Sequence, residues 1–337
     1  MSFSRRQFIM GMGAAATGAI PVHAGNLLKL GGQTMSGTKT RSGAMSCPFR
    51  LAVINDEISQ DFGHACEVAS KDFGLNWIEI RGLWNKSLAD LDEKEIAEAR
   101  SILEKNHLRV TDLASPLFKV DWPGAPVSHA SERRDEFHAD FTFRQQDELL
   151  ERQIELAKIF QTDRIRCFDF WRLDNPKPYR AAINDKLRSA AEKCAKHNLI
   201  LLLENEGSCN TATGAESAEL LNAIPNKNFM LNWDPGNAAG VGEIPYPNGY
   251  DLLPKDRIGH CHCKDVSVAP DGKRSWAPVG SGIIDWVGQF RALKKQGYHY
   301  AVSLETHWRG AGTPEASSRI SMKGLKDTLH KAGINCG

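Results

Sequence analysis

From Phe49 onward, eight short runs rich in aliphatic and β-branched residues alternate with stretches of helical periodicity. Strands that alternate with helices pair in parallel through right-handed crossovers, and eight such units close into a barrel. The sequence therefore predicts a single-domain (β/α)8 TIM barrel over residues 48–337. The predicted strands cover residues 50–54, 77–80, 109–113, 164–168, 199–203, 229–232, 258–263 and 300–304.

The helical stretches support the same architecture. An α/β barrel needs about 250 residues, so a chain of 337 residues can be one domain. The alternative, an open doubly wound sheet, would usually have a Gly-rich phosphate loop after its first strand. Here that strand ends in Asn55-Asp56-Glu57, which contains no glycine. Helices are predicted over residues 62–73, 92–106, 141–160, 178–197, 215–223, 286–296 and 316–332, whereas the Gly/Pro-rich stretch 235–254 should contain little helix.

The N-terminus has the features of an export signal. A twin-arginine pattern over residues 4–9 is followed by a weakly apolar, Gly/Ala-rich stretch and by Val22-His23-Ala24, a small-residue cleavage site. The apolar stretch is shorter than the roughly 20 residues of a membrane span. We therefore expect a twin-arginine (Tat) signal peptide over residues 1–24, a flexible leader over residues 25–47, and a periplasmic or secreted protein that engages the Tat export machinery.

Charge and cysteine usage exclude some partners. The 42 Lys and Arg residues nearly balance the 41 Asp and Glu residues, which gives no electrostatic case for nucleic acid or an anionic membrane. Cys261 and Cys263 flank His262 in a predicted strand, so their thiols point to the opposite face from the imidazole and indicate packing rather than zinc binding. Disulfides are possible after export, but the spacing of the eight cysteines assigns no pair.

Acidic and imidazole side chains follow four consecutive predicted strands: Glu204, Asp234, His262 and Glu305. Barrel enzymes place their active groups at these strand ends. Half-buried carboxylates are costly unless a cation neutralises them, and three carboxylates with one imidazole suit one divalent Mn, Mg, Co or Zn ion. Two carboxylates beside such an ion could move a proton from and to carbon. The alternative is that each acid pairs with a nearby Arg or Lys.

At these residues the chain resembles the xylose isomerase-like TIM barrel superfamily, the sugar phosphate isomerase/epimerase group, over about residues 49–332. The resemblance implies that Glu204, Asp234, His262 and Glu305 bind the metal. It also implies that Glu204 and Glu305 act as the acid/base pair in proton abstraction next to a carbonyl, through an enediolate. The motifs that carry the resemblance are Leu201-Leu202-Leu203-Glu204-Asn205, Asn232-Trp233-Asp234-Pro235-Gly236-Asn237, His262-Cys263-Lys264-Asp265, Val279-Gly280-Ser281-Gly282-Ile283-Ile284-Asp285-Trp286 and Ser303-Leu304-Glu305-Thr306-His307.

The sequence departs from the ketose epimerases of this group at two positions. Asn237 stands where they often place a substrate-gripping histidine, and Lys264 replaces an acidic residue. Lys264 could stabilise an oxyanion or pair with a neighbouring acid. His260 is expected to be a hydrogen-bonded core histidine, with a supporting or ligating role as the alternative. The predicted substrate-binding residues are Arg81, Trp171, Glu206, Asn237, Lys264 and His307.

The leading hypothesis is a metal-dependent isomerase or epimerase of a small unphosphorylated sugar or polyol. A keto-sugar or keto-glycoside lyase or hydratase would use the same site, because it also begins with carbon-acid proton removal. A nuclease resembling the apurinic-site endonucleases of the superfamily would need more histidines and a basic groove. A non-catalytic sugar-binding protein is the remaining alternative.

Overall fold

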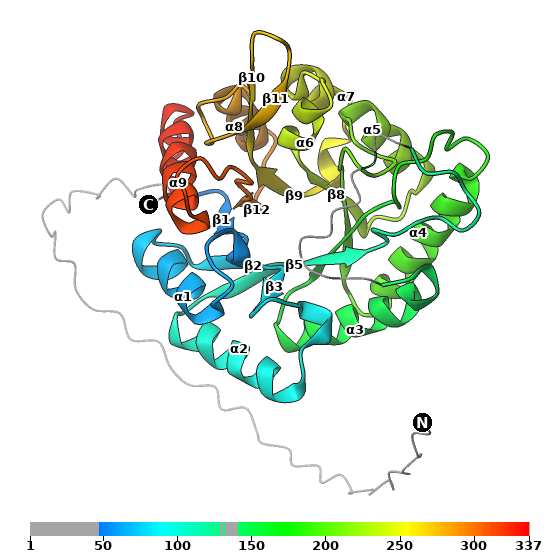
Figure 1. The fold of residues 1–337 in the computed structure, drawn as a ribbon, viewed down its shortest axis with the longest axis horizontal. Helices are drawn as coiled ribbons and strands as arrows, with labels where there is room; N and C mark the ends of the chain where they lie inside the picture. The colour runs from blue at the N-terminus through cyan, green and yellow to red at the C-terminus, as the bar shows by residue number, and fades with distance from the viewer. Residues whose placement is uncertain (1–46, 129–130, 132–140, 337) are drawn as a thin grey trace, which may run out of the picture. The chain divides into compact units, whose positions relative to one another are not determined.

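Eight parallel strands form one sheet in the order β1-β12-β9-β8-β7-β6-β5-β2 (Figure 1). The computed structural model describes residues 47–128, 131 and 141–336. A parallel bridge between Ile54 and Glu79 joins the first strand to the second and completes the ring. The predicted (β/α)8 barrel is confirmed. The strands are β1 (Arg50–Val53), β2 (Trp77–Ile80), β5 (Arg109–Leu117), β6 (Arg164–Cys167), β7 (Ile200–Glu204), β8 (Phe229–Trp233), β9 (Ile258–Cys263) and β12 (Ala301–Leu304).

Helices surround the strands (Figure 1), and buried apolar side chains of the longer helices belong to one hydrophobic cluster with those of the strands. Several begin at side-chain caps that the sequence supplies, such as the Asp92–Glu95 and Thr213–Glu216 capping boxes. Residues 235–254 contain three short helical segments between bends. The α-helices are α1 (Phe62–Glu67), α2 (Glu93–Lys105), α3 (Gln146–Ile159), α4 (Arg180–Ala195), α5 (Gly214–Ala223), α6 (Pro235–Gly240), α7 (Tyr250–Leu252), α8 (Trp286–Lys295) and α9 (Pro314–Lys331). The π and 3-10 segments are η1 (Asn55–Glu57), η2 (Val68–Asp72), η3 (Leu88–Asp90), η4 (Phe143–Gln145), η5 (Pro245–Gly249) and η6 (Lys255–Arg257).

The two faces of strand β9 show how the core is divided. Cys261 and Cys263 are fully buried in the hydrophobic cluster between strands and helices. His260 and His262 alternate with them and contact Glu79 on β2, so they point into the barrel. The described cysteines other than Cys47 and Cys336 are buried free thiols, which confirms wall packing at this strand.

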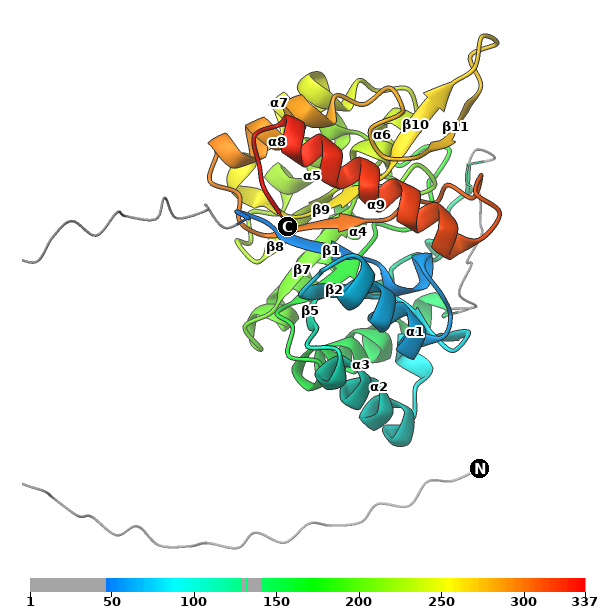
Figure 2. The same cartoon turned by 90° about the vertical axis from the view of Figure 1, so that its left-hand side faces the viewer.

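A small antiparallel hairpin, β10 (Asp265–Val268) and β11 (Arg274–Ala277), follows strand β9 and stands out from the barrel (Figure 2). The sequence did not predict it, because its residues alternate too weakly to distinguish a hairpin from a loop. A second short pair, β3 (Gly82–Leu83) and β4 (Lys86–Ser87), follows β2. Both hairpins lie beyond the carboxyl ends of barrel strands, where functional loops are found.

Asp265 connects two of the motifs found in the sequence. Its carboxylate accepts backbone hydrogen bonds from Gly280, Gly282 and Ile284 at 2.9, 3.1 and 3.3 Å. Gly280 has a φ of +83°, and a Cβ on Gly282 would lie 2.2 Å from Asp265 Oδ1. The glycines are therefore required for the loop to close around the carboxylate. Both Asp265 oxygens accept hydrogen bonds from the backbone of this loop rather than from the Lys264 ammonium.

A disulfide joins Cys47, just before β1, to Cys336, just after α9. The two cysteines are separated by 289 positions in sequence, which is why spacing alone did not reveal the pair. Disulfides persist in oxidising compartments. The predicted signal peptide and residues 25–46 of the predicted leader lie outside the described residues. None of the helices that the structure describes is both long enough and apolar enough to cross a membrane.

We predict that Cys336→Ser lowers the free energy of unfolding by about 2–4 kcal/mol, because the chain loses a cross-link around nearly the whole barrel. Urea unfolding of the oxidised proteins measures the difference. Cys194→Ser is the control, because it removes a buried free thiol and keeps the disulfide. Reductant should still lower its free energy of unfolding. A wild-type protein whose stability is unchanged by reductant would contradict the cross-link.

Candidate metal centre

Four buried side chains meet at the carboxyl ends of four adjacent strands. Glu204 ends β7, Asp234 follows β8, His262 lies on β9 and Glu305 follows β12. One potential ligand atom from each lies within 4.8 Å of the others. His262 Nδ1 is 3.2 Å from Glu204 Oε1, 3.6 Å from Asp234 Oδ2 and 3.1 Å from Glu305 Oε2. The structure thus brings together all four residues that the sequence predicted as metal ligands.

Local hydrogen bonds orient the Asp234 carboxylate towards this cluster. Asp234 is the N-cap of α6, and its Oδ1 accepts a hydrogen bond from the backbone of Asn237 at 2.9 Å. The Asn205 side chain holds the Asp234 backbone from both sides, accepting from its N–H at 2.8 Å and donating to its carbonyl at 2.9 Å. With Oδ1 engaged in the cap, Oδ2 is the oxygen that faces His262.

Positive side chains also surround the cluster, as the alternative interpretation required. Arg166 Nη1 lies 2.9 Å from Glu204 Oε2, and Arg81 Nη1 lies 2.6 Å from Glu305 Oε1. Both arginines bind the carboxylate oxygen that is turned away from His262. In each glutamate an arginine therefore binds the outer oxygen, while the inner oxygen faces the centre of the cluster.

Lys264 approaches two of the inward oxygens, at 2.9 Å from Asp234 Oδ2 and 2.6 Å from Glu305 Oε2. Among the described residues, however, neither oxygen receives a hydrogen bond of good geometry. Three buried carboxylate oxygens that face one imidazole nitrogen are a donor set that suits a divalent cation. The residues present therefore fit a metal ion.

Both candidate acid/base residues are ionised in this environment. Burial alone would raise the pKa of Glu204, but His262 and Arg166 lower it to about 2. Burial likewise opposes the charge of Glu305, whose pKa is nevertheless held well below its usual range by Lys264, His307 and His262. Glu204 and Glu305 are thus carboxylates at neutral pH, the form needed to bind a cation or to accept a proton.

Lys264 and Asn237 complete the inner surface of the site. Both are buried, and Lys264 can reach the acids because Gly236 has no side chain: a Cβ there would lie 2.1 Å from Lys264 Cγ. Asn237 donates to Glu204 Oε1 at 3.2 Å and accepts from Lys264 Nζ at 3.1 Å. Asn237 therefore links one end of the cluster to the other.

Arg81 and His307 belong to a network around Glu305 that includes two acids the sequence analysis did not select. The Arg81 guanidinium contacts Glu305, Asp56 and Glu57. His307 Nε2 is 3.2 Å from Glu305 Oε1 and 3.5 Å from Glu57 Oε1. Arg81 thus positions carboxylates. The signal for the missed acids was their place directly after the first predicted strand.

Trp171 and Glu206 lie to one side of the cluster. Trp171 is buried against Phe168 and Cys209. Glu206 Oε2 is 3.7 Å from Lys119 Nζ, which lies 5.5 Å from the centre of the Trp171 ring. Within the described part of the chain, Glu206 forms no ion pair with the four candidate ligands. Substrate contact by these two residues remains a prediction.

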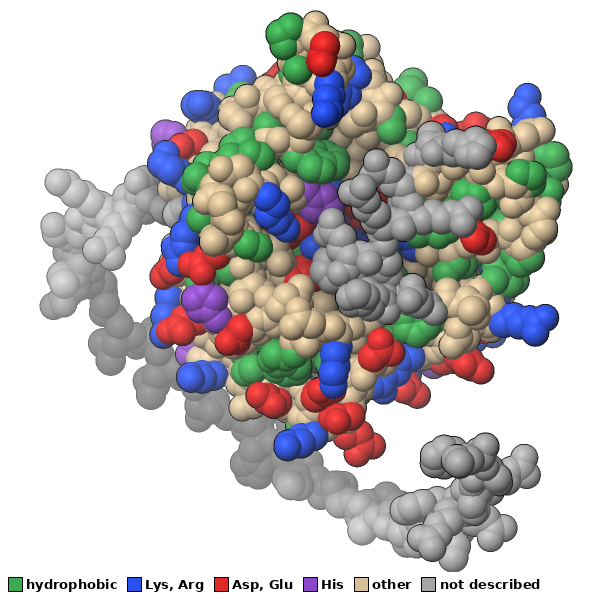
Figure 3. Space-filling view, viewed as in Figure 1, with side chains coloured by type: hydrophobic (Ala, Val, Ile, Leu, Met, Phe, Trp, Pro, Cys, Tyr) green, Lys and Arg blue, Asp and Glu red, His purple; other side chains and the backbone are tan. Residues whose placement is uncertain are grey.

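Trp276 is an aromatic residue near the cluster that the sequence analysis missed. It lies on β11, half-buried, with Lys264 Nζ 5.4 Å from the centre of its ring. Its ring centre is 5.5 Å from that of His307. On the face viewed down the barrel, basic, acidic and histidine side chains show together near the middle (Figure 3). A residue in a loop of unknown path carries no signal of this placement.

The fold and these motifs agree with comparisons to known proteins. Residues 68–328 match the family model described as "Xylose isomerase-like TIM barrel", and the chain belongs to that family. It is 30% identical over 116 residues to the 3-dehydroshikimate dehydratase of Bacillus anthracis, covering 34% of this chain and 41% of that protein. It is 24% identical over 197 residues to "Putative L-ribulose-5-phosphate 3-epimerase SgbU" of Escherichia coli (strain K12), covering 56% of this chain and 67% of that protein. The chain therefore spans less than half of the dehydratase.

Solved structures share the fold at low sequence identity. The "probable 3-DHS dehydratase AsbF" of Bacillus anthracis has a TM-score of 0.62 at 21% identity, covering 82% of this chain and 98% of that chain. A family member from Mycobacterium smegmatis in complex with magnesium has a TM-score of 0.58 at 14% identity, covering 80% and 88%. The IOLI protein with a bound zinc atom has a TM-score of 0.63 at 17% identity, covering 84% and 99%.

We predict that Glu57→Gln destabilises the barrel most at neutral pH. Burial raises the pKa of Glu57, but His307, Arg81 and Arg309 lower it from 4.5 to about 2. Because the folded-state pKa lies below the unfolded one, this stabilisation is full above about pH 4.5 and is lost as the pH falls toward 2. The shift corresponds to roughly 3 kcal/mol at pH 7.

Urea unfolding of wild type and Glu57→Gln at pH 7 and at pH 3.5 tests this. The difference in the free energy of unfolding between the two proteins should be smaller by about 1 kcal/mol at the lower pH. Glu67→Gln, at an exposed position, serves as the control and should show a much smaller gap. A gap for Glu57→Gln that is independent of pH would show that its charge is not what stabilises the fold.

Proposed function

We propose that this protein is a metal-dependent isomerase or epimerase that acts on a small unphosphorylated sugar or polyol by proton transfer next to a carbonyl. The observation that carries the proposal is the convergence of three carboxylate oxygens on His262 Nδ1 at 3.1–3.6 Å. Family membership and its similarity to an epimerase and a dehydratase support an enzyme of this class.

One divalent ion would be held by Glu204, Asp234, His262 and Glu305. This donor set is compatible with Mn, Mg, Co or Zn and does not select among them. When bound, such an ion polarises a carbonyl and makes the neighbouring C–H more acidic. Magnesium and zinc in two proteins of the same fold are consistent with a divalent ion here. Every other part of the reaction is assigned to the protein's own side chains.

We assign the exchange of protons with carbon to Glu204 and Glu305. They come from the outer two of the four adjacent strands, β7 and β12, so they flank Asp234 and His262. Arg166 and Arg81 hold their outer oxygens. One glutamate takes the proton from carbon and the other returns one, and inversion follows when removal and return occur on opposite faces. The Lys264 ammonium can stabilise negative charge that develops on a substrate oxygen.

The substrate class follows from the walls of the site and from the predicted route of the protein. Lys264 and Asn237 present polar groups, and Trp276 presents an aromatic face on which sugar C–H groups can stack. An exported enzyme would meet free sugars rather than phosphorylated ones. The Cys47–Cys336 disulfide, with the twin-arginine pattern, supports a periplasmic or secreted location reached through the Tat machinery.

A dehydratase or related lyase is the second candidate. The specific observation in its favour is the 30% identity to the Bacillus anthracis 3-dehydroshikimate dehydratase over 116 residues. Elimination of water also begins when a carboxylate removes a proton next to a carbonyl. The two candidates differ in the next step: the carbanion is either reprotonated or expels a neighbouring oxygen substituent.

We predict that Glu204→Gln and Glu305→Gln each reduce turnover by about 10²–10⁴-fold, since the amide cannot accept the proton. The measurement is deuterium uptake from D₂O by a panel of keto-sugars in the presence of Mn²⁺, followed by mass spectrometry. Glu67→Gln, which removes an exposed carboxylate on α1, is the control and should keep most of the activity. Full activity in either variant of the first pair would refute the acid/base assignment.

The same reactions separate the two candidates. Reprotonation gives an isomer that carries solvent deuterium at carbon, whereas elimination gives a product lighter by water or by an alcohol. If wild type forms only the lighter product, the dehydratase or lyase replaces the isomerase. If it binds sugars tightly but exchanges no proton with any of them, the chain is a binding protein.

We predict that Trp276→Ala raises KM about tenfold or more with a smaller effect on kcat, because a stacking wall contributes mainly to substrate binding. Trp276→Phe keeps an aromatic face and should recover most of the affinity. Steady-state kinetics on the substrate found in the panel measures both. A Trp276→Ala enzyme with unchanged KM would place the substrate away from the β10–β11 hairpin.

A further inference from the structure

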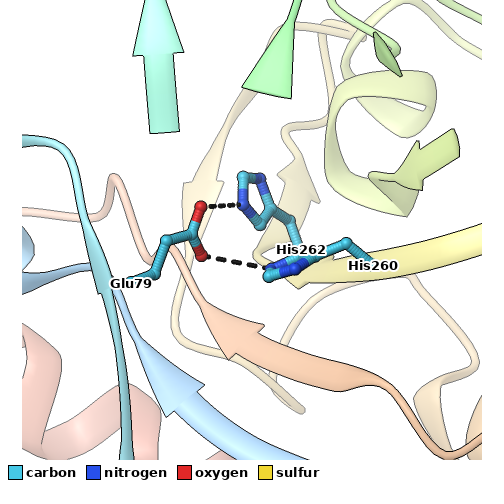
Figure 4. Close-up of side chains that lie close together, drawn as sticks. All are labelled: Glu79, His260 and His262. Carbon is cyan, nitrogen blue, oxygen red and sulfur yellow. Dashed lines mark hydrogen bonds and ion pairs between the residues drawn. The ribbon is translucent and has the colours of Figure 1, made fainter. Parts of the chain in front are cut away.

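Glu79 is a fully buried carboxylate that none of the proposed catalytic steps uses. It lies on β2 and points across the barrel interior to the two histidines of β9 (Figure 4). Its Oε1 is 2.9 Å from His262 Nε2, and its Oε2 is 3.2 Å from His260 Nε2. One carboxylate thus binds both imidazoles, each with a different oxygen.

This contact determines which nitrogen of His262 keeps its proton when the other nitrogen binds a cation. A carboxylate only accepts hydrogen bonds, so the imidazole nitrogen that faces Glu79 must be N–H. That nitrogen is Nε2. Nδ1 faces Glu204, Asp234 and Glu305, and it is the nitrogen whose proton a bound cation would replace. A histidine that binds a metal through one nitrogen commonly donates the other N–H to a carboxylate, which fixes the ring and makes it a better ligand.

The other neighbours of His262 do not perform this role. Asn232 Nδ2 lies 3.3 Å from Nδ1 and 3.1 Å from Nε2, so it sits beside the ring rather than on the line of either nitrogen's lone pair. His260 meets the ring edge-on at 89°, with 5.2 Å between ring centres. Of these neighbours, Glu79 is the one whose carboxylate accepts a hydrogen bond from Nε2, at 2.9 Å.

We propose that Glu79 is a positioning residue that holds His262 with Nε2 protonated and Nδ1 directed at the three carboxylates, and that it thereby sets the metal affinity of the site. His260 acts as the second anchor: by binding the other oxygen, it keeps the Glu79 carboxylate from rotating away. The inference rests on the proposed metal centre, but it concerns affinity rather than turnover.

The test is a calorimetric titration of Zn²⁺ and, separately, Mn²⁺ into metal-free protein. Glu79→Gln should weaken binding about 10–100-fold, because the amide can accept from one histidine but presents N–H to the other. Glu67→Gln, a carboxylate-to-amide change at an exposed position on α1, is the control and should bind as wild type does. Thermal unfolding of the metal-free proteins shows whether a weaker affinity merely follows from a less stable barrel.

The outcomes of the titration separate this inference from the proposed function. If the wild-type protein binds neither ion, the proposed metal centre is wrong. If wild type binds and Glu79→Gln binds with the same constant, the metal centre stands and the positioning role is wrong. Weaker binding by Glu79→Gln together with a metal-free melting temperature close to that of wild type supports the proposal.

A second measurement needs no substitution at Glu79. Wild-type protein labelled with ¹⁵N-histidine and loaded with ¹¹³Cd²⁺ reports by NMR which nitrogen binds the metal and which carries hydrogen. We expect cadmium coupling at Nδ1 of His262 and an attached proton at Nε2. Coupling at Nε2 would overturn the proposal even if the Glu79→Gln variant failed to fold.

Discussion

The structure is organised around one buried imidazole that lies between carboxylates on two sides. His262 faces Glu79 with Nε2 and three further acids with Nδ1, and none of these groups is more than 2% exposed. Buried charges of one sign cannot be left uncompensated, because the loss of hydration costs several kcal/mol for each ion. The cationic side chains around the cluster, Arg81, Arg166 and Lys264, follow from this constraint.

The arginines distinguish the two oxygens of each glutamate: one oxygen binds a guanidinium, and the other faces His262. Arg166 and Arg81 bind the outer oxygens of Glu204 and Glu305, and the inner oxygens remain directed at His262. An arginine at one oxygen orients the carboxylate and leaves the other oxygen for a cation or a proton. At Glu305 this inner oxygen also lies 2.6 Å from Lys264 Nζ, so a bound cation would share the oxygen with the ammonium or displace the ammonium. The presence of arginine partners is therefore compatible with catalysis.

Sequence reasoning succeeded where chemistry follows strand order. In a parallel barrel each strand delivers its last side chains to the same rim, so Glu204, Asp234, His262 and Glu305 could be grouped before any contact was known. It missed Glu79 and Trp276, because neither position is distinguished locally. Glu79 matters through a contact across the barrel, and Trp276 through a hairpin that returns over the site.

The sequence by itself determined the barrel, the order of its strands and the four side chains at the rim, because alternation and periodicity are local properties of the chain. Only the tertiary structure decided which oxygen of each carboxylate faces His262, that Arg81 holds acids, and that Cys47 pairs with Cys336. These features depend on distances between residues far apart in sequence, and such distances are set by the closure of the barrel rather than by any segment alone.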